Sequence, residues 1–203
     1  MKRLLLAIIV YGLWAGPAAA QLRVFSCEPE WAELARVIGG EHVEAFSATT
    51  AAQDVHFIQA RPSLIARLRN ADVLVCTGAG LEAGWLPVLQ RRANNPAVVA
   101  GAPGHLDVSQ WVTLLDQRAV VDRSAGDVHP EGNPHFHLDP RNLLIIAKQL
   151  AERFAALDAG HAAAYHAGAE AFVKNWQASI SKWEAATADL RGTRVVTHHL
   201  DWN

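Results

Sequence analysis

The sequence lacks any excess of positive charge and, after its first twenty residues, any long apolar run. Lys and Arg number 18 against 20 Asp and Glu, so the formal net charge is −2. The absence of a basic stripe or polybasic patch argues against nucleic acid or an anionic membrane surface as a partner. No later run of about 18 apolar residues occurs, so we expect no membrane-spanning helix.

Residues 1–20 have the three parts of a secretory signal peptide. A positively charged start is followed by an apolar stretch from Leu4 to Trp14 and then by small residues, Ala18 to Ala20. The apolar stretch is short for a membrane span. No cysteine follows it directly, which argues against a lipid anchor. We predict that this segment is cleaved, that the mature chain begins at Gln21, and that it is a soluble periplasmic protein.

Cysteine is scarce, with only Cys27 and Cys76 in the chain. Both stand at the ends of predicted strands. In an oxidising compartment a disulfide between them is allowed, and two buried free thiols are the competing interpretation, because pairing depends on a Cα separation that the sequence does not show. With 51% hydrophobic residues, the roughly 180 residues after the signal peptide are enough to bury a core.

The apolar pattern of the first half predicts alternating strands and helices. Strands are expected at residues 22–26, 42–48, 71–76 and 96–101, with a helix between each successive pair. This order predicts an α/β fold, with a Rossmann-like parallel sheet and helices on its faces. A ligand site in such a sheet is expected at the carboxyl ends of the strands.

Two helices and one further strand are expected in the second half. Asp139 and Pro140 have the pattern of an N-cap followed by proline at the first helical position. A longer helix is expected from His161 to about Leu190, and its length of roughly 45 Å would suit a bridge between two lobes. Residues 193–197 are expected to form a strand, and because a strand cannot pair alone, we interpret the chain as a fragment that lacks most of a second lobe. The predicted domains are the signal peptide (1–20), an N-terminal α/β metal-binding lobe (21–158), a long linking helix (159–191) and the first strand of a truncated C-terminal lobe (192–203).

Most of the ten histidines have an ordinary structural explanation. His129 lies in the polar loop DVHPEGN and is interpreted as a surface histidine. His56, in QDVHFIQARPS, lies in a loop just before a helix and is a candidate metal ligand. The isolated histidines, interpreted as solvated or hydrogen-bonded side chains, are His42, His105, His161 and His166.

The segment NPHFHLDP gives the strongest indication of a metal site. An H-x-H pair in an extended segment would place His135 and His137 on the same side, and the flanking prolines restrict the backbone and lower the cost of ordering a site. His198 and His199 end a predicted strand and point to opposite faces, so one of them is expected to face a site at the strand tip. Three neutral imidazoles, from these two clusters and from the loop of His56, suit zinc with a fourth ligand still to be found.

Four segments, in this order, resemble the zinc/manganese solute-binding proteins of ABC importers, the cluster A-I or TroA-like family. QDVHFIQARPS is similar to that family's D-P-H-x-Y-E-P-x-P-S, with Val55 and Gln59 as departures. ADVLVCTGAGLEAGWLP resembles A-D-L-V-x-x-N-G-x-x-L-E-x-W, and NPHFHLDP resembles N-P-H-x-W-L-D-P, with His137 in place of Trp. VVTHHLDW resembles V-x-x-H-D-A-F/Y, with His199 at the ligand position and Leu200 where Asp is usual.

The resemblance implies two α/β lobes joined by a long rigid helix, with one metal ion in the cleft. It carries over His56, His135 and His199 as three ligands, with His137 as an additional or alternative one, and places an acidic fourth ligand beyond Asn203. Histidine at the third position resembles the zinc branch, and nitrogen donors favour zinc whereas manganese prefers oxygen. Zinc-type members also often carry a histidine- and acid-rich loop before NPHFHLDP. GDVHPEGN is a short version of it, so the resemblance gives a capture role for His129 as a further hypothesis.

The resulting hypothesis is a periplasmic zinc-binding protein that delivers Zn²⁺, its transported ligand, to the membrane permease of an ABC importer. It predicts a monomer that is not an enzyme and binds no nucleic acid, with a periplasmic metallochaperone as a further candidate partner. The main alternative is a zinc-dependent hydrolase using the His-x-His site, which would need an open coordination position and a general base beside the metal. A surface adhesin is a third interpretation, against which the missing lipid-anchor cysteine argues.

Overall fold

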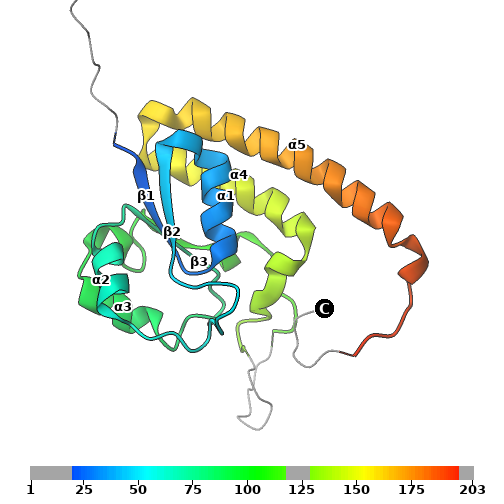
Figure 1. Ribbon diagram of the computed structural model, residues 1–203, viewed down its shortest axis with the longest axis horizontal. Coiled ribbons are helices and arrows are strands. Elements are labelled where there is room, and N and C mark those ends of the chain that lie inside the picture. Colours follow the sequence, from blue (N-terminus) through cyan, green and yellow to red (C-terminus); the bar gives the residue numbers. More distant parts are fainter. Residues whose placement is uncertain (1–19, 118–128, 197–203) are drawn as a thin grey trace, which may run out of the picture.

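The computed structural model describes residues 20–117 and 129–196 of the chain (Figure 1). The predicted signal peptide falls almost entirely on residues 1–19, and His198 and His199 also lie outside the described residues. Within the described ranges, no helix is both long and apolar enough to cross a membrane.

A four-stranded parallel sheet forms the centre of the molecule. Its spatial order is β2-β1-β3-β4, and all three strand pairs are parallel. The α/β class predicted from the sequence is therefore confirmed. The strands are β1 (Leu22–Ser26), β2 (Val43–Ser47), β3 (Val73–Cys76) and β4 (His105–Asp107).

The fourth strand does not lie where the sequence pattern placed it. Residues 96–101 begin with the 3₁₀ helix η2 (Pro96–Val98), so the prediction of a strand there is wrong. Pro96 has no amide hydrogen for a strand ladder, and the Asn95 side chain accepts a hydrogen bond from the Ala97 amide and caps the turn. The edge of the sheet is instead the three-residue β4, which pairs with β3.

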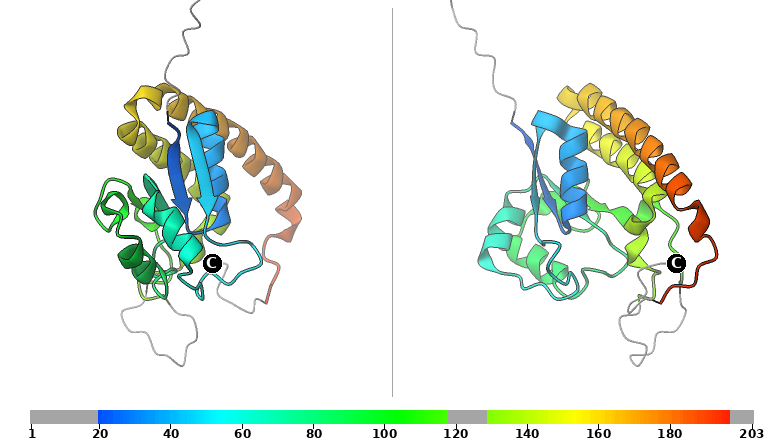
Figure 2. Two further views of the ribbon diagram at one scale, coloured as in Figure 1. Left: turned by 60° about the vertical axis from the view of Figure 1, so that its left-hand side comes forward. Right: turned by 45° about the vertical axis from the view of Figure 1, so that its right-hand side comes forward.

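Helices cover both faces of the sheet (Figure 2). One face carries three helices and the other carries two, and each face has its own buried cluster. Val73 and Val75 point to the three-helix face, whereas Leu74 and Cys76 point to the two-helix face, because successive side chains of a strand alternate. The three helices are α1 (Pro29–Gly39), α4 (Pro140–Leu157) and α5 (Ala162–Ala186), and the two are α2 (Pro62–Arg69) and α3 (Leu86–Ala93).

The start of α4 confirms the Asp139–Pro140 prediction, since the Asp139 side chain accepts a hydrogen bond from the Arg141 amide. The following helix, α5, ends at Ala186, and a short 3₁₀ helix, η7 (Ala188–Leu190), follows it. Together they cover the range over which the sequence predicted one long helix, from His161 to about Leu190. Its distal part extends beyond the sheet (Figure 1) and is partly open to solvent, with Trp183 43% exposed. Residues 193–196 form no strand, and the described chain supplies no partner strand beside them. The predicted domain boundaries remain predictions.

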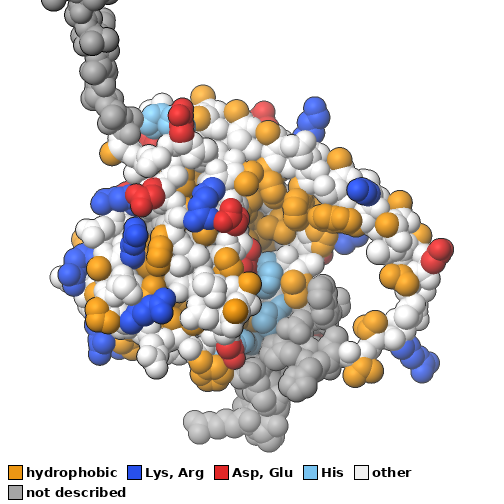
Figure 3. Space-filling view, in the orientation of Figure 1, with side chains coloured by type: hydrophobic (Ala, Val, Ile, Leu, Met, Phe, Trp, Pro, Cys, Tyr) orange, Lys and Arg blue, Asp and Glu red, His pale blue; other side chains and the backbone are white. Residues whose placement is uncertain are grey.

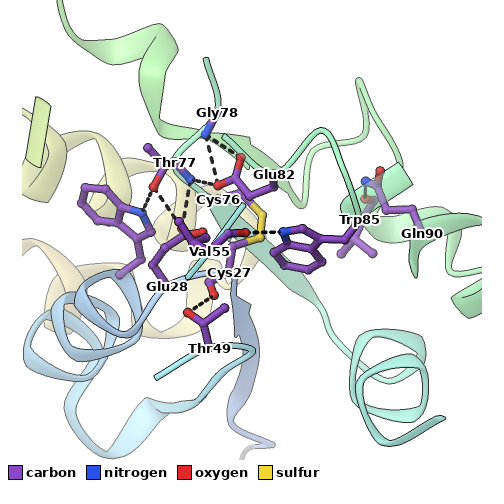
Figure 4. Close-up of a disulfide and its surroundings, with 12 residues drawn as sticks. Cys27, Glu28, Thr49, Val55, Cys76, Thr77, Gly78, Glu82, Trp85 and Gln90 are labelled. Atoms are coloured by element: carbon purple, nitrogen blue, oxygen red, sulfur yellow. Dashed lines mark hydrogen bonds between the residues drawn. A yellow bond between two sulfur atoms is a disulfide. The ribbon is translucent and has the colours of Figure 1, made fainter. Parts of the chain in front are cut away.

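A disulfide joins the carboxyl ends of the two central strands. Cys27 follows β1, Cys76 ends β3, and their Cα atoms lie 4.8 Å apart (Figure 4). The disulfide, rather than two free thiols, is therefore the state of this pair. Closing a loop with a sequence separation of 49 stabilises the fold by about 4 kcal/mol in the chain-entropy model.

Two buried carboxyl groups, Glu28 and Glu82, meet at Thr77 beside this disulfide (Figure 4). The Thr77 amide donates to Glu82 Oε1 at 2.7 Å and to Glu28 Oε2 at 3.3 Å, and the Thr77 hydroxyl donates to Glu28 Oε2 at 2.9 Å. Burial raises the pKa of Glu82 to about 7. Burial, followed by repulsion from Glu82, also raises the pKa of Glu28 well above its usual value. The fold therefore favours protonated carboxyl groups at this point.

One glycine allows α5 to lie directly against α1. A Cβ atom at Gly168 would overlap the backbone oxygen of Ile38 in α1. We expect Gly168→Ala to lower the free energy of unfolding by about 1–3 kcal/mol through overpacking, even though alanine favours helix by about 1 kcal/mol. The matched control is Gly160→Ala, whose nearest described neighbour would be Asp158 Oδ1 at an ordinary 3.7 Å. Urea unfolding of both variants is the measurement, and a Gly168→Ala protein as stable as the control would contradict this packing.

The buried carboxyl pair makes stability depend on pH. Because the folded pKa of Glu82 lies near 7 and the ordinary value is 4.5, its stabilising contribution is fully present below pH 4.5 and is lost as pH rises through 7. This difference between the folded and the ordinary pKa corresponds to about 3 kcal/mol in the free energy of unfolding. We expect Glu82→Gln to reduce the loss of stability between pH 5 and pH 8, with Glu28 still contributing to it, and Glu170→Gln, on the exposed side of α5, to leave it unchanged. Unfolding curves at both pH values test this, and equal pH dependence in the two variants would refute it.

Candidate metal centre

The segments that carry the predicted ligands lie beyond the carboxyl ends of the strands. His56 lies in the loop between β2 and α2, and His135 and His137 lie in the 3₁₀ helix η5 (Pro134–Leu138), which leads into α4. Histidine side chains gather on this side of the molecule, next to the grey atoms of Figure 3. This is the edge of the sheet at which the sequence predicted a ligand site.

The loop of His56 is fixed from both sides. The buried Trp85 donates a hydrogen bond from Nε1 to the Val55 carbonyl oxygen at 2.8 Å. The His56 backbone amide and its ring Nδ1 both lie within hydrogen-bond distance of Asp54 Oδ1, at 3.0 and 2.8 Å. Because an ionised carboxylate only accepts hydrogen bonds, Nδ1 carries the proton and Nε2 presents its lone pair. A histidine oriented by a carboxylate in this way is a common arrangement for a metal ligand.

The H-x-H pair is not extended, so that part of the prediction is wrong. Pro134 begins η5, and the Asn133 side chain caps it by accepting a hydrogen bond from the His135 amide at 2.9 Å. Asn142 of α4 donates to the Phe136 carbonyl oxygen at 2.8 Å and holds η5 on the helix that follows. Residues two apart in a 3₁₀ helix do not share a face, and the rings of His135 and His137 lie 6.2 Å apart at 68°.

The two histidines of η5 have different neighbours. The His135 ring lies 6.4 Å from the His56 ring, and its Nε2 atom is buried. His137 is directed toward α1, with Nε2 3.8 Å from Glu30 Oε1 and its ring edge-on to Trp31 at 6.3 Å. The geometry therefore pairs His135, rather than His137, with His56.

His129 also belongs to this cluster. Its Nε2 atom lies 3.3 Å from Nε2 of His56, and the two ring centroids are 5.4 Å apart. The interpretation of His129 as a surface histidine is therefore wrong. The indication for His129 in the sequence was the resemblance of GDVHPEGN to the histidine-rich loop of zinc-type members. The indication for the orienting carboxylate was the D-x-H spacing of Asp54 and His56.

The remaining histidines with a prediction lie away from this cluster or outside the residues that the structure describes. His199, the third predicted ligand, lies among residues 197–203, which the structure does not describe. His161 bonds to Asp158 Oδ2 at 2.7 Å through Nδ1 and stacks on His42 at 4.1 Å. His161 is thus hydrogen-bonded, as expected from the sequence.

The family model described as zinc-uptake complex component A, periplasmic (ZnuA), matches residues 24–203. Among curated proteins, the chain is 23% identical over 156 residues to the iron ABC transporter substrate-binding lipoprotein MtsA of Streptococcus pyogenes serotype M1, covering 75% of this chain and 47% of that protein. It is also 23% identical over 141 residues to the manganese ABC transporter substrate-binding lipoprotein PsaA of Streptococcus pneumoniae, covering 68% and 42%. The chain spans about half the length of the curated relatives it matches.

Solved structures share the fold. A crystal structure of ZnuA superposes with a TM-score of 0.73 at 21% identity, covering 90% of this chain and 66% of that one. A manganese-bound periplasmic metal-binding protein from Candidatus Liberibacter asiaticus gives a TM-score of 0.62 at 19% identity, covering 84% and 56%. With the family model matching most of its length, the chain belongs to the ZnuA family of periplasmic substrate-binding proteins of metal ABC transporters.

Proposed function

We propose that this protein binds Zn²⁺ in the periplasm and delivers it to the membrane permease of an ABC importer. The observation that carries the proposal is the orientation of His56, whose Nδ1 is held by Asp54 while its Nε2 lies toward other imidazoles. We infer that His56 and His135 are ligands and that His199 is a third. The metal is the transported substrate, so the protein needs no catalytic machinery.

The donor types favour zinc over manganese. His56 and His135 offer nitrogen, which suits Zn²⁺, whereas Mn²⁺ prefers carboxylate and carbonyl oxygen. The Asp54 carboxylate, which lies 2.8 Å from His56 Nδ1, is engaged in orienting the ring. The relatives are named for iron or manganese, so the preference for zinc rests on the side chains of this chain rather than on family membership.

The proposed partners follow from the transport role. The permease would receive the metal, and a periplasmic metallochaperone is a candidate donor of it. We propose that the protein acts as a monomer after cleavage of the signal peptide at residues 1–20. The family consists of binding proteins rather than enzymes, and the hydrolase alternative therefore finds no support.

The assignment of His135 over His137 can be tested by metal competition. We expect one tight Zn²⁺ equivalent in the unaltered protein, preferred over Mn²⁺ in a chelator-competition titration. His56→Ala and His135→Ala should each weaken zinc binding by about 100-fold or more, because losing a ligand costs more than the 10–100-fold typical of an outer-shell partner. His137→Ala should retain the site.

The matched control for that titration is His166→Ala, in a half-exposed histidine of α5. Loss of zinc in His137→Ala and its retention in His135→Ala would reverse the assignment. Absence of a tight zinc site in the unaltered protein would end the proposed function.

Removing the orienting carboxylate should weaken the site without abolishing it. In Asp54→Asn the side chain still reaches His56, but it no longer carries the negative charge that holds the proton on Nδ1. We expect zinc affinity to fall by about 10–100-fold with an unchanged unfolding transition of the metal-free protein. Asp189→Asn, on exposed η7, is the control. Equal affinity in the two variants would show that Asp54 does not orient a ligand.

A further inference from the structure

Five exposed arginines gather on the face of the sheet that α2 and α3 cover. Neither of these helices contains an acidic residue. Figure 3 shows basic side chains, in blue, grouped on the side of the molecule where Figure 1 places α2 and α3. The sequence has no basic run, because these residues are spread from position 61 to position 92 and only the packing of α2 against α3 brings them together. This arginine face consists of Arg61, Arg67, Arg69, Arg91 and Arg92.

Most of the positive charge of the arginine face is not neutralised within the described residues. Arg67 lies 3.5 Å from Glu44 Oε1, but both side chains are more than half exposed, and such a pair contributes little. Arg69 donates to two backbone carbonyl oxygens at the end of α3, at 3.2 and 3.3 Å, and these acceptors are neutral. Asp72, at the edge of the face, is already paired with Arg23 at 2.8 Å. The other three arginines form no ion pair with any carboxylate that the structure describes.

The opposite face of the sheet carries both signs of charge. Each of α1, α4 and α5 contains acidic and basic residues. Two of the arginines there pair with glutamates, Arg36 with Glu33 and Arg141 with Glu184. The whole chain has a formal net charge of −2. The arginine face is therefore a local accumulation of positive charge that the composition of the chain does not explain.

The chemistry of the arginine face suits a surface that carries many phosphate groups. A guanidinium group binds phosphate through two parallel hydrogen bonds, which a lysine ammonium group does not do. The eight-residue helices α2 and α3 are each about 12 Å long, so their arginines are spread too widely to surround one small anion. Anionic lipid headgroups attract clusters of basic residues in this way. A membrane lies within reach, because the family consists of binding proteins of membrane transporters.

Contact of this face with a bilayer would leave the metal centre open. The helices α2 and α3 cover one face of the sheet (Figure 2), whereas His56 and His135 lie beyond the carboxyl ends of the strands. The face and that edge of the sheet point in different directions. Metal binding and membrane contact therefore do not exclude one another.

We propose that the arginine face docks on the anionic phospholipid headgroups of the membrane that holds the transporter. Docking would keep the protein at the membrane surface, where the distance to a permease is short. The inference goes beyond the proposed zinc transport, because it involves neither the metal nor its ligands. It replaces the expectation from net charge and from the missing basic run that an anionic membrane is not a partner.

The test is co-sedimentation of the mature protein with vesicles of about one third phosphatidylglycerol and two thirds phosphatidylcholine. We expect binding to these vesicles and none to pure phosphatidylcholine. Binding should fall as salt rises from about 0.1 M to about 1 M, because the Debye length shrinks from about 10 Å to about 3 Å. The variant is Arg61→Gln/Arg91→Gln/Arg92→Gln. Each basic residue near an anionic surface contributes roughly fivefold, so this variant should bind about 100-fold more weakly.

The matched control removes the same number of charges from the opposite face. Lys148→Gln/Lys174→Gln/Lys182→Gln changes three exposed lysines of α4 and α5, and we expect it to keep most of the binding. The unfolding transition of each variant shows that the fold is retained, and a zinc titration should give the same affinity in both. A loss confined to the arginine variant supports the proposal.

Two results would overturn the proposal. An equal loss in the arginine and lysine variants would show that net charge, rather than this face, determines the binding. Absence of binding to the phosphatidylglycerol vesicles, which an acidic protein partner of this face would also produce, would exclude the membrane as the occupant. Neither result bears on zinc binding, and a protein without a tight zinc site would leave the vesicle measurement unaffected.

Discussion

The fixed carboxyl ends of β1 and β3 are the constraint on which the metal centre depends. The Cys27–Cys76 disulfide joins the two strands there, and Thr77, directly after it, accepts a hydrogen bond from Trp31 of α1 at 2.8 Å. Glu28 and Glu82 accept hydrogen bonds from the same residue. The strand ends, α1 and the turn after β3 are thereby held as one unit. Burial in this unit raises the pKa of both carboxyl groups.

Each histidine of the centre is positioned by a contact with this unit or with α4. Trp85, which begins α3 after the turn that Glu82 closes, fixes the loop of His56. The capped start of α4 fixes η5, and therefore His135, through Asn142. The loops that carry the ligands are irregular, but their anchors are side chains buried in or beside the sheet. This arrangement holds the ligands in defined positions although they do not lie on regular helices or strands.

The sequence predicted those features that depend on local pattern. The first three strands, the Asp139–Pro140 helix start and the location of the site at the strand ends follow from apolar periodicity, capping chemistry and parallel topology. The prediction of a strand at residues 96–101 failed because an apolar run does not reveal that Asn95 caps a turn there. The approach of His129 to His56 joins residues 73 positions apart, and no local pattern encodes a contact between two loops. The sequence did not decide between a disulfide and two free thiols for the same reason, because the separation of the two cysteines depends on which strands are neighbours in the sheet.

The central claim is that imidazole nitrogens, and not sulfur, supply most of the ligands of the metal. Zinc K-edge X-ray absorption of the protein loaded with one equivalent of Zn²⁺ measures this directly. The account predicts a first shell of nitrogen at about 2.0–2.1 Å with the outer scattering of at least three imidazole rings. Sulfur at about 2.3 Å would mean that Cys27, Cys76 and the adjacent Glu82 form the site after reduction of the disulfide. That result, or an oxygen shell with one imidazole at most, would contradict the account.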